Sequence, residues 1–119
     1  MDAVGEEGAR RVRAFRATDA FALAVWQTLR GFTRAEGETL AREIRSALAR
    51  SGGALVAAAS APEGDERGRR ALESAHQGLL EIRYFLYLAR RLGCLDLKVY
   101  KQLATLQEAA LRELAQLLG

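Results

Sequence analysis

The feature that most constrains this chain is a run of regularly spaced apolar residues between positions 72 and 89. They follow one another at alternating steps of three and four, which places them on one side of an α-helix and is typical of the seam of a helix bundle. The residues of this seam are Leu72, Ala75, Leu79, Ile82, Leu86 and Ala89. Because an isolated amphipathic helix is only marginally stable in water, the seam predicts that other helices cover it.

Helical periodicity also marks three other segments, and few β-branched residues interrupt it. Turn residues separate the segments at 31–37, at 62–64 and at Gly93. We expect the first helix to begin near Thr18 or Asp19 and the second to span about residues 38–60. The third should begin near Asp65 and end at Gly93, and the fourth should begin near Asp96. The predicted fold class is therefore all-α, an antiparallel up-and-down four-helix bundle.

The ends of these helices have suitable capping residues. Asp65 and Asp96 can cap the third and fourth helices, and Thr18 or Asp19 can cap the first. This divides the chain into a bundle over residues 18–119 and a basic N-terminal arm over residues 1–17. We expect the arm to be either frayed or to add a turn of helix.

Size and composition fit one globular domain. Of the 119 residues, 50% are hydrophobic and 28% are charged, which supports a single core and differs from the composition of disordered chains. The one cysteine, Cys94, has no partner for an intramolecular disulfide, which indicates a reducing compartment. The start of the chain does not resemble a signal peptide, and no run approaches the roughly 20 apolar residues of a membrane span. We expect a cytoplasmic protein with no membrane partner.

Two features predict contacts beyond the seam. Gly52 and Gly53 lie within the second helix, where each costs about 1 kcal/mol relative to Ala. We expect them to permit the close approach of another backbone, the alternative being a break in the helix. On the third helix, Phe85, Leu88 and Leu92 form a second apolar stripe about 90° from the seam. So wide an apolar arc predicts a homo-oligomer.

Charge and aromatic residues predict a nucleic-acid-binding face, with RNA as the expected partner. The net charge is +3 at pH 7 and most of the 18 cations are arginines, which bind phosphate with two hydrogen bonds and stack on flat rings. Opposite the seam of the third helix, cations alternate with tyrosines, a mixture that neutralises phosphates and stacks bases. The predicted contacts are Arg83, Tyr84, Tyr87, Arg90, Arg91, Lys98 and Lys101, with Arg10, Arg11, Arg13 and Arg16 as a flexible supplement.

Other classes of function remain as alternatives or are disfavoured. The same arginines and tyrosines suit the rim of a protein interface, so the main alternative is a structural or protein-interaction bundle without nucleic-acid binding. Arg70 and His76 match the Arg-x(4–6)-His spacing of HEPN ribonucleases, a remote alternative because a chain rich in arginine produces this spacing by chance. One histidine and one cysteine cannot form a zinc site. We expect no enzymatic activity, no cofactor, no metal and no small-molecule substrate.

Five short stretches carry a resemblance to a known family. They are Leu-Ala-Val-Trp-Gln at 23–27, Leu-Ala-Arg-Glu-Ile-Arg-Ser-Ala at 40–47, Ala-His-Gln-Gly-Leu-Leu-Glu-Ile at 75–82, Leu-Ala-Arg-Arg-Leu-Gly-Cys-Leu at 88–95 and Val-Tyr at 99–100. Through them the chain resembles the four-helix-bundle family that includes proteins encoded in intervening sequences of bacterial 23S ribosomal RNA genes. The family commonly has Asn-Ile-Ala-Glu-Gly late in the second helix, where this chain has Ala-Leu-Val-Ala-Ala at 54–58.

A branch of this family is similar in losing that polar segment and in its aromatic third helix, here Ile-Arg-Tyr-Phe-Leu at 82–86. The branch comprises the accessory variability determinants of diversity-generating retroelements. These form barrel-like homopentamers that bind a reverse transcriptase and its template RNA. The resemblance therefore implies an oligomeric, non-enzymatic accessory module for RNA or for an RNA–protein partner.

Overall fold

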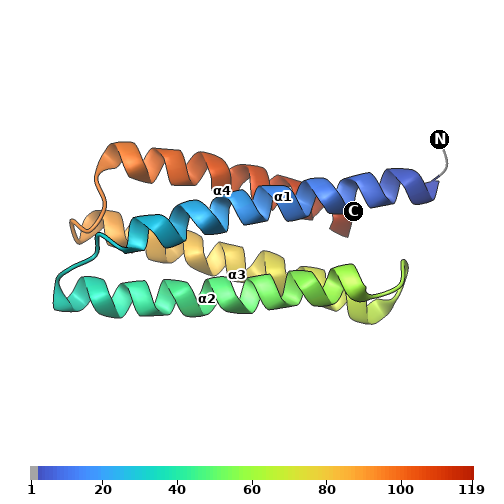
Figure 1. Ribbon diagram of the computed structural model, residues 1–119, viewed down its shortest axis with the longest axis horizontal. Coiled ribbons are helices and arrows are strands. Elements are labelled where there is room, and N and C mark those ends of the chain that lie inside the picture. The colour runs from blue at the N-terminus through green and yellow to red at the C-terminus, as the bar shows by residue number, and fades with distance from the viewer. Residues whose placement is uncertain (1–2) are drawn as a thin grey trace.

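Four helices make up most of the computed structural model, which describes the backbone of residues 3–119 and the side chains of residues 5–119 (Figure 1). They are α1 (Ala3–Leu29), α2 (Ala35–Ser60), α3 (Glu66–Arg91) and α4 (Leu97–Leu118). Successive helices run in opposite directions and are joined by short connections. The predicted fold is confirmed: the protein is an all-α, antiparallel up-and-down four-helix bundle.

Around the bundle axis the helices follow the order α1, α4, α3, α2. The main contacts are between α2 and α3 and between α1 and α4, while α3 and α4 contact each other over a smaller area. The diagonal pairs make no close backbone contact within the described residues, and α1 and α2 contact each other least among the neighbouring pairs. The molecule is thus two helix pairs joined mainly through α3 and α4, and the backbones of α1 and α2 lie apart along most of their length (Figure 1).

The predicted seam of α3 forms the centre of the core. Ala75, Leu79, Ile82, Leu86 and Ala89 are all buried, and only Leu72, near the start of the helix, is half-buried. Large fully buried side chains come from all four helices, as expected for a bundle with a single core.

One polar contact and one close approach fix how α3 packs on its neighbours. The Gln107 side chain of α4 is buried, and its Nε2 donates a hydrogen bond of 2.7 Å to the Leu79 carbonyl oxygen. On the other side, a Cβ at Gly78 would overlap the Ser51 hydroxyl of α2. The backbones of α2 and α3 therefore meet where α3 has no side chain.

The predicted caps hold for α3 and α4 but not for α1. The Asp65 carboxylate accepts a hydrogen bond of 2.8 Å from the Arg67 N–H, and Asp96 accepts one of 2.8 Å from the Val99 N–H. Thr18 caps nothing, because it lies buried in the middle of α1. Each capping carboxylate also places a negative charge at the positive end of a helix dipole.

The basic arm predicted over residues 1–17 is part of α1 in the structure, except for residues 1–2, which lie outside the described residues. The buried face of α1 starts at Ala14 and continues through Thr18, Phe21 and Val25 at steps of four, three and four. This stripe extends the seam of α1 toward the N-terminus with one small and one polar residue. The boundary predicted between residues 17 and 18 therefore falls inside a continuous helix.

Two further expectations need correction. A Cβ at Gly52 or Gly53 would meet no atom within 4 Å, and α2 runs through both without a break. The predicted close approach is therefore wrong at these glycines.

The second apolar stripe of α3 is mostly covered within the chain. Phe85 and Leu88 are half-buried against the chain's own core, and only Leu92 of this stripe is exposed. Most of the wide apolar arc of α3 is used within the bundle, because α3 contacts both α2 and α4.

Candidate nucleic-acid interface

The turn between α3 and α4 holds the predicted basic residues in a defined arrangement. Gly93 has a φ of 80°, a left-handed conformation that favours glycine. The Cys94 N–H donates to the Ala89 carbonyl oxygen at 2.9 Å, and the Gly93 N–H donates to the Arg90 carbonyl oxygen at 3.2 Å. This pair of hydrogen bonds is a Schellman motif, which ends α3 sharply and directs the chain into α4.

Most of the predicted contact residues are accessible. Tyr84 is 60% exposed and Tyr87 is 47% exposed. The cations are also exposed, apart from the half-buried Arg90; the exposed ones are Arg83, Arg91, Lys98 and Lys101. None of these cations forms an ion pair with another described residue. Their charges are therefore available to an anion from outside the chain.

Cations and rings lie close enough on this face to act together. The Arg91 guanidinium lies 5.9 Å from the centre of the Tyr87 ring, within cation–π range. The ring centres of Tyr84 and Phe85 are 6.1 Å apart. Arg83 lines a hollow of about 200 Å³ between α3 and α4, together with Tyr100. Such a surface can pair with phosphate and offer rings to bases.

Two basic residues that the sequence analysis did not single out lie at the same end of the bundle. Arg30 and Arg34 flank the connection from α1 to α2, which lies beside the connection from α3 to α4 (Figure 1). A hollow of about 160 Å³ between the connections is lined by Arg34 and Leu92, among others. We call this region the basic end, which comprises Arg30, Arg34, Arg90, Arg91, Lys98 and Lys101. The up-and-down topology alone brings these two connections together.

The arginines of the former arm do not join this surface. The half of α1 that carries them lies toward the opposite end of the bundle (Figure 1). Arg10 and Arg11 each approach Glu7 at 3.8 Å, and Arg13 pairs with Glu113 of α4 at 3.6 Å. Arg16 is exposed on the same helix. These arginines are fixed on α1, so they do not form a flexible supplement to the face on α3.

The two residues of the ribonuclease-like spacing leave α3 in different directions. Arg70 and His76 lie six positions apart on α3, so their side chains leave the helix in directions about 120° apart at roughly 100° per residue. Arg70 is exposed and His76 is half-buried. Within the described residues, no group of three or more His, Cys, Asp or Glu side chains could hold a metal ion.

Comparisons with protein-family models, with characterised proteins and with solved structures found no match. In the described part of the chain, no helix is both long and apolar enough to cross a membrane.

Proposed function

We propose that this protein is a non-enzymatic RNA-binding accessory module, which presents the basic end and the tyrosines of α3 to structured RNA or to an RNA–protein complex. One observation carries the proposal: exposed cations that form no ion pair with any described residue lie beside two exposed tyrosines. By the resemblance, the partner is the reverse transcriptase of a diversity-generating retroelement with its template RNA.

The uneven distribution of charge supports this choice of face. At the other end of the bundle, arginines lie next to carboxylates: Arg67 approaches Asp65 at 3.7 Å and Arg69 approaches Glu73 at 3.4 Å. Neighbouring opposite charges cancel each other's field. The basic end also carries the carboxylates Glu36, Glu38 and Asp96, but its six cations outnumber them and none of these groups is ion-paired within the described residues. Such an excess of positive charge attracts a polyanion and speeds its association. RNA is therefore drawn to the basic end.

We further propose that the module acts as a homo-oligomer, a pentamer by the resemblance. Leu92 and Leu97 beside the basic end are 39% and 47% exposed. Association of two chains would remove these apolar side chains from water, which favours the oligomer. Light scattering on the purified protein measures its mass directly. A monomer that binds RNA would contradict the oligomeric part of the proposal and leave the RNA-binding part intact.

The test of RNA binding is a titration of a labelled RNA hairpin at several salt concentrations. Each phosphate contact contributes about 0.7–0.9 to the slope of log K against log salt. We expect Arg83→Gln and Arg91→Gln each to lower the slope by about this amount. Tyr87→Leu should weaken binding by about 1–3 kcal/mol at an unchanged slope, because it removes stacking and no charge.

Arg67→Gln is the matched control. It removes the same charge from the same helix at the opposite end, and the Arg67 side chain is 85% exposed. Binding that is insensitive to salt, or an equal effect of Arg67→Gln, would contradict the proposed face. An oligomer that ignores RNA would favour the protein-interaction bundle. Cleavage of RNA by the unaltered protein but not by His76→Ala would overturn the non-enzymatic part.

A further inference from the structure

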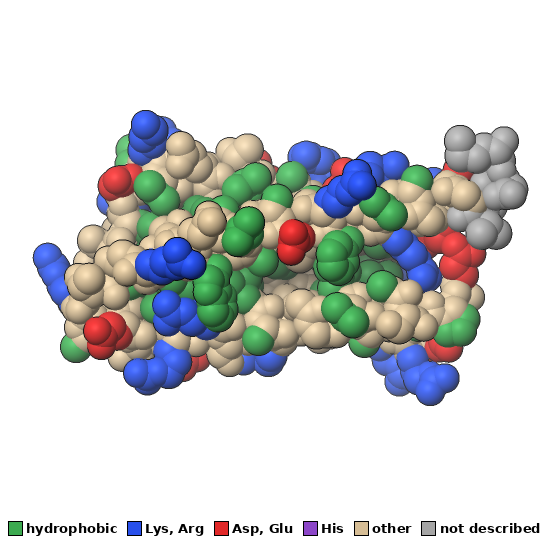
Figure 2. Space-filling model, in the orientation of Figure 1, with side chains coloured by type: hydrophobic (Ala, Val, Ile, Leu, Met, Phe, Trp, Pro, Cys, Tyr) green, Lys and Arg blue, Asp and Glu red, His purple; other side chains and the backbone are tan. Residues whose placement is uncertain are grey.

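The side of the bundle where α1 faces α2 is open and apolar. Figure 2 shows hydrophobic side chains along the line between these two helices. On α1, Phe15 and Trp26 are 46% and 45% exposed. On α2, Val56 is 56% exposed, and its spacing of eleven residues from Arg45, which lies over Trp26, puts it on the side of α2 that faces α1. Large apolar side chains left in water along one line are typical of a surface that binds another protein. We call this surface the α1–α2 groove.

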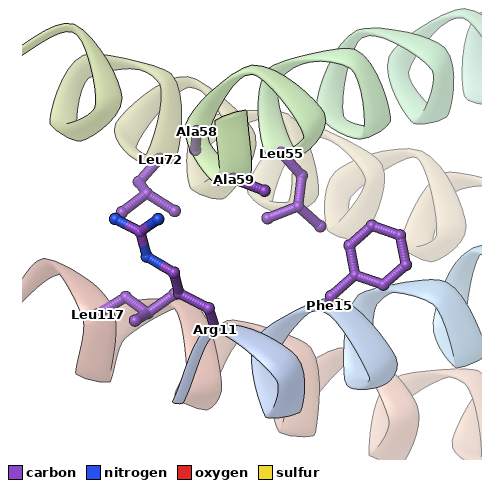
Figure 3. A pocket seen from close by; sticks show the side chains of 7 residues that line it. All are labelled: Arg11, Phe15, Leu55, Ala58, Ala59, Leu72 and Leu117. Carbon is purple, nitrogen blue, oxygen red and sulfur yellow. The ribbon is translucent and has the colours of Figure 1, made fainter. Parts of the chain in front are cut away.

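A small apolar pocket of the α1–α2 groove lies between the first half of α1 and the end of α2 (Figure 3). Phe15 and Leu55 stand at one side of the opening, and Leu72 and Leu117 reach the other side from α3 and α4. Arg11 extends across, and its guanidinium donates a hydrogen bond of 3.4 Å to the Ala61 carbonyl oxygen. The opening is therefore lined by apolar side chains and one arginine.

The α1–α2 groove continues along the helices for about three turns. Phe15 and Trp26 are eleven residues apart on α1, which is about 16 Å at 1.5 Å per residue. The Arg45 guanidinium of α2 lies over the Trp26 ring, 5.4 Å from the ring centre. Gly52 is seven residues after Arg45 and therefore on the same side of α2. A Cβ at Gly52 would meet no atom within 4 Å, so this part of the groove has room for another chain.

The charges around the α1–α2 groove determine what can fill it. From residue 44 to residue 62 the chain has no carboxylate. On α1, the one carboxylate between Phe15 and Trp26 is Asp19, which is exposed and lies on the same face as both rings. Arg16 and Arg45 form no ion pair with any described residue. The groove carries two unpaired cations and one carboxylate. A second copy of this chain would bring the same excess of positive charge, whereas the carboxylates of an acidic partner would neutralise Arg16 and Arg45.

We propose that the α1–α2 groove binds an acidic amphipathic helix of a partner protein. Apolar side chains at positions i, i+4, i+7 and i+11 of that helix occupy the space from Phe15 to Trp26, and its flanking Glu or Asp residues face Arg16 and Arg45. The groove lies on the opposite side of the bundle from the α3–α4 surface. The inference is therefore independent of the proposed binding of RNA.

Trp26 is the only tryptophan of the chain, and its fluorescence reports the groove directly. The probe is a synthetic helical peptide with Leu at i, i+4, i+7 and i+11 and Glu at most other positions. We expect it to shift the Trp26 emission to shorter wavelength, because burial removes the ring from water. Val56→Glu should weaken the binding of the peptide by about tenfold or more, since it replaces an apolar side chain with a negative charge that repels the glutamates of the peptide.

Ala57→Glu is the matched control. It adds the same charge one residue further along α2, at an exposed position about 100° away around the helix, and we expect binding within about twofold of the unaltered protein. Equal binding of a peptide with Lys in place of Glu would overturn the proposal, as would an unchanged Trp26 emission.

Two further measurements separate this proposal from its competitors. If Val56→Glu dissociates an oligomer of the protein while the peptide does not bind, the groove is an interface between copies and the proposal is wrong. The salt dependence of RNA binding, measured on the same Val56→Glu protein, should be unchanged. A protein that fails to bind RNA but binds the peptide would contradict the proposed function and support the groove.

Discussion

Position 78 shows how one missing side chain sets the distance between two helices. Gly78 faces Ser51, whose hydroxyl is buried and donates a hydrogen bond of 3.3 Å to the Ala75 carbonyl oxygen. A methyl group at position 78 displaces this hydroxyl or separates the helices. Overpacking of this kind costs about 2 kcal/mol, and the higher helix propensity of Ala offsets about 1 kcal/mol of it.

We therefore expect Gly78→Ala to lower the free energy of unfolding by about 1 kcal/mol, measured by urea denaturation. Adding Ser51→Ala removes the overlapping hydroxyl and should recover part of the loss. Additive effects of the two substitutions would show that the two residues do not interact, contrary to their contact in the bundle.

The position of a glycine relative to the buried side of its helix decides whether a neighbouring backbone can approach it. Gly78 follows Ala75 by three residues and precedes Ile82 by four, so it lies on the buried side of α3. Gly53 follows Ile44 by nine residues, which places it on the opposite side of α2 from that buried residue at about 100° per residue. The close approach expected at Gly52 and Gly53 is therefore absent there, and it occurs at Gly78, where none was predicted.

At the scale of the helix, Gly53 lowers the helix propensity of α2 at a position where the packing leaves room for a side chain. Gly53 is exposed, lies inside the helix and has open space around its Cα. Gly53→Ala should raise the free energy of unfolding by about 0.5–1 kcal/mol, because Ala restricts the unfolded chain and clashes with nothing. The rise in melting temperature, followed by circular dichroism, measures this effect.

Gly93→Ala is the opposite control. At a φ of 80° an alanine is strained by about 1 kcal/mol or more, so this variant should melt at a lower temperature. A lower melting temperature for Gly53→Ala would mean that a partner or a second copy covers α2 at this position in solution.

The helices differ in how well the sequence predicts them. The limits of α3 and α4 were predicted closely, because Asp65, Gly93 and Asp96 are strong local signals for helix ends. The first half of α1 was missed because its buried stripe starts with Ala14 and Thr18, which carry little apolar signal. Packing against α4 maintains the helix there, and packing is a property of the fold and not of the local sequence.

For the whole molecule, the basic end was predicted in part and the groove was not predicted. The cations of α3 and α4 are near one another in sequence, so periodicity and one turn sufficed to group them. The α1–α2 groove depends on the order of the helices around the axis and on how far α1 lies from α2. Neither follows from the amphipathic pattern of a single helix, because a bundle can close in more than one order.

The pairing of α1 with α4 also has consequences for the order of folding. The helices of the α2–α3 pair are adjacent in sequence, whereas α1 must meet a helix from the other end of the chain. Closing the longer loop costs more entropy. In refolding followed by pulsed hydrogen exchange, amides of α2 and α3 should become protected before those of α1, and earlier protection of α1 would contradict this order.

A ribosome makes α1 first and α4 last. During synthesis, the apolar face of α1 around Phe21, Val25 and Leu29, which α4 and the rest of the core later bury, has no permanent cover until the last helix has emerged. This short stretch is therefore where a nascent chain is most exposed to aggregation and where a chaperone has most to protect.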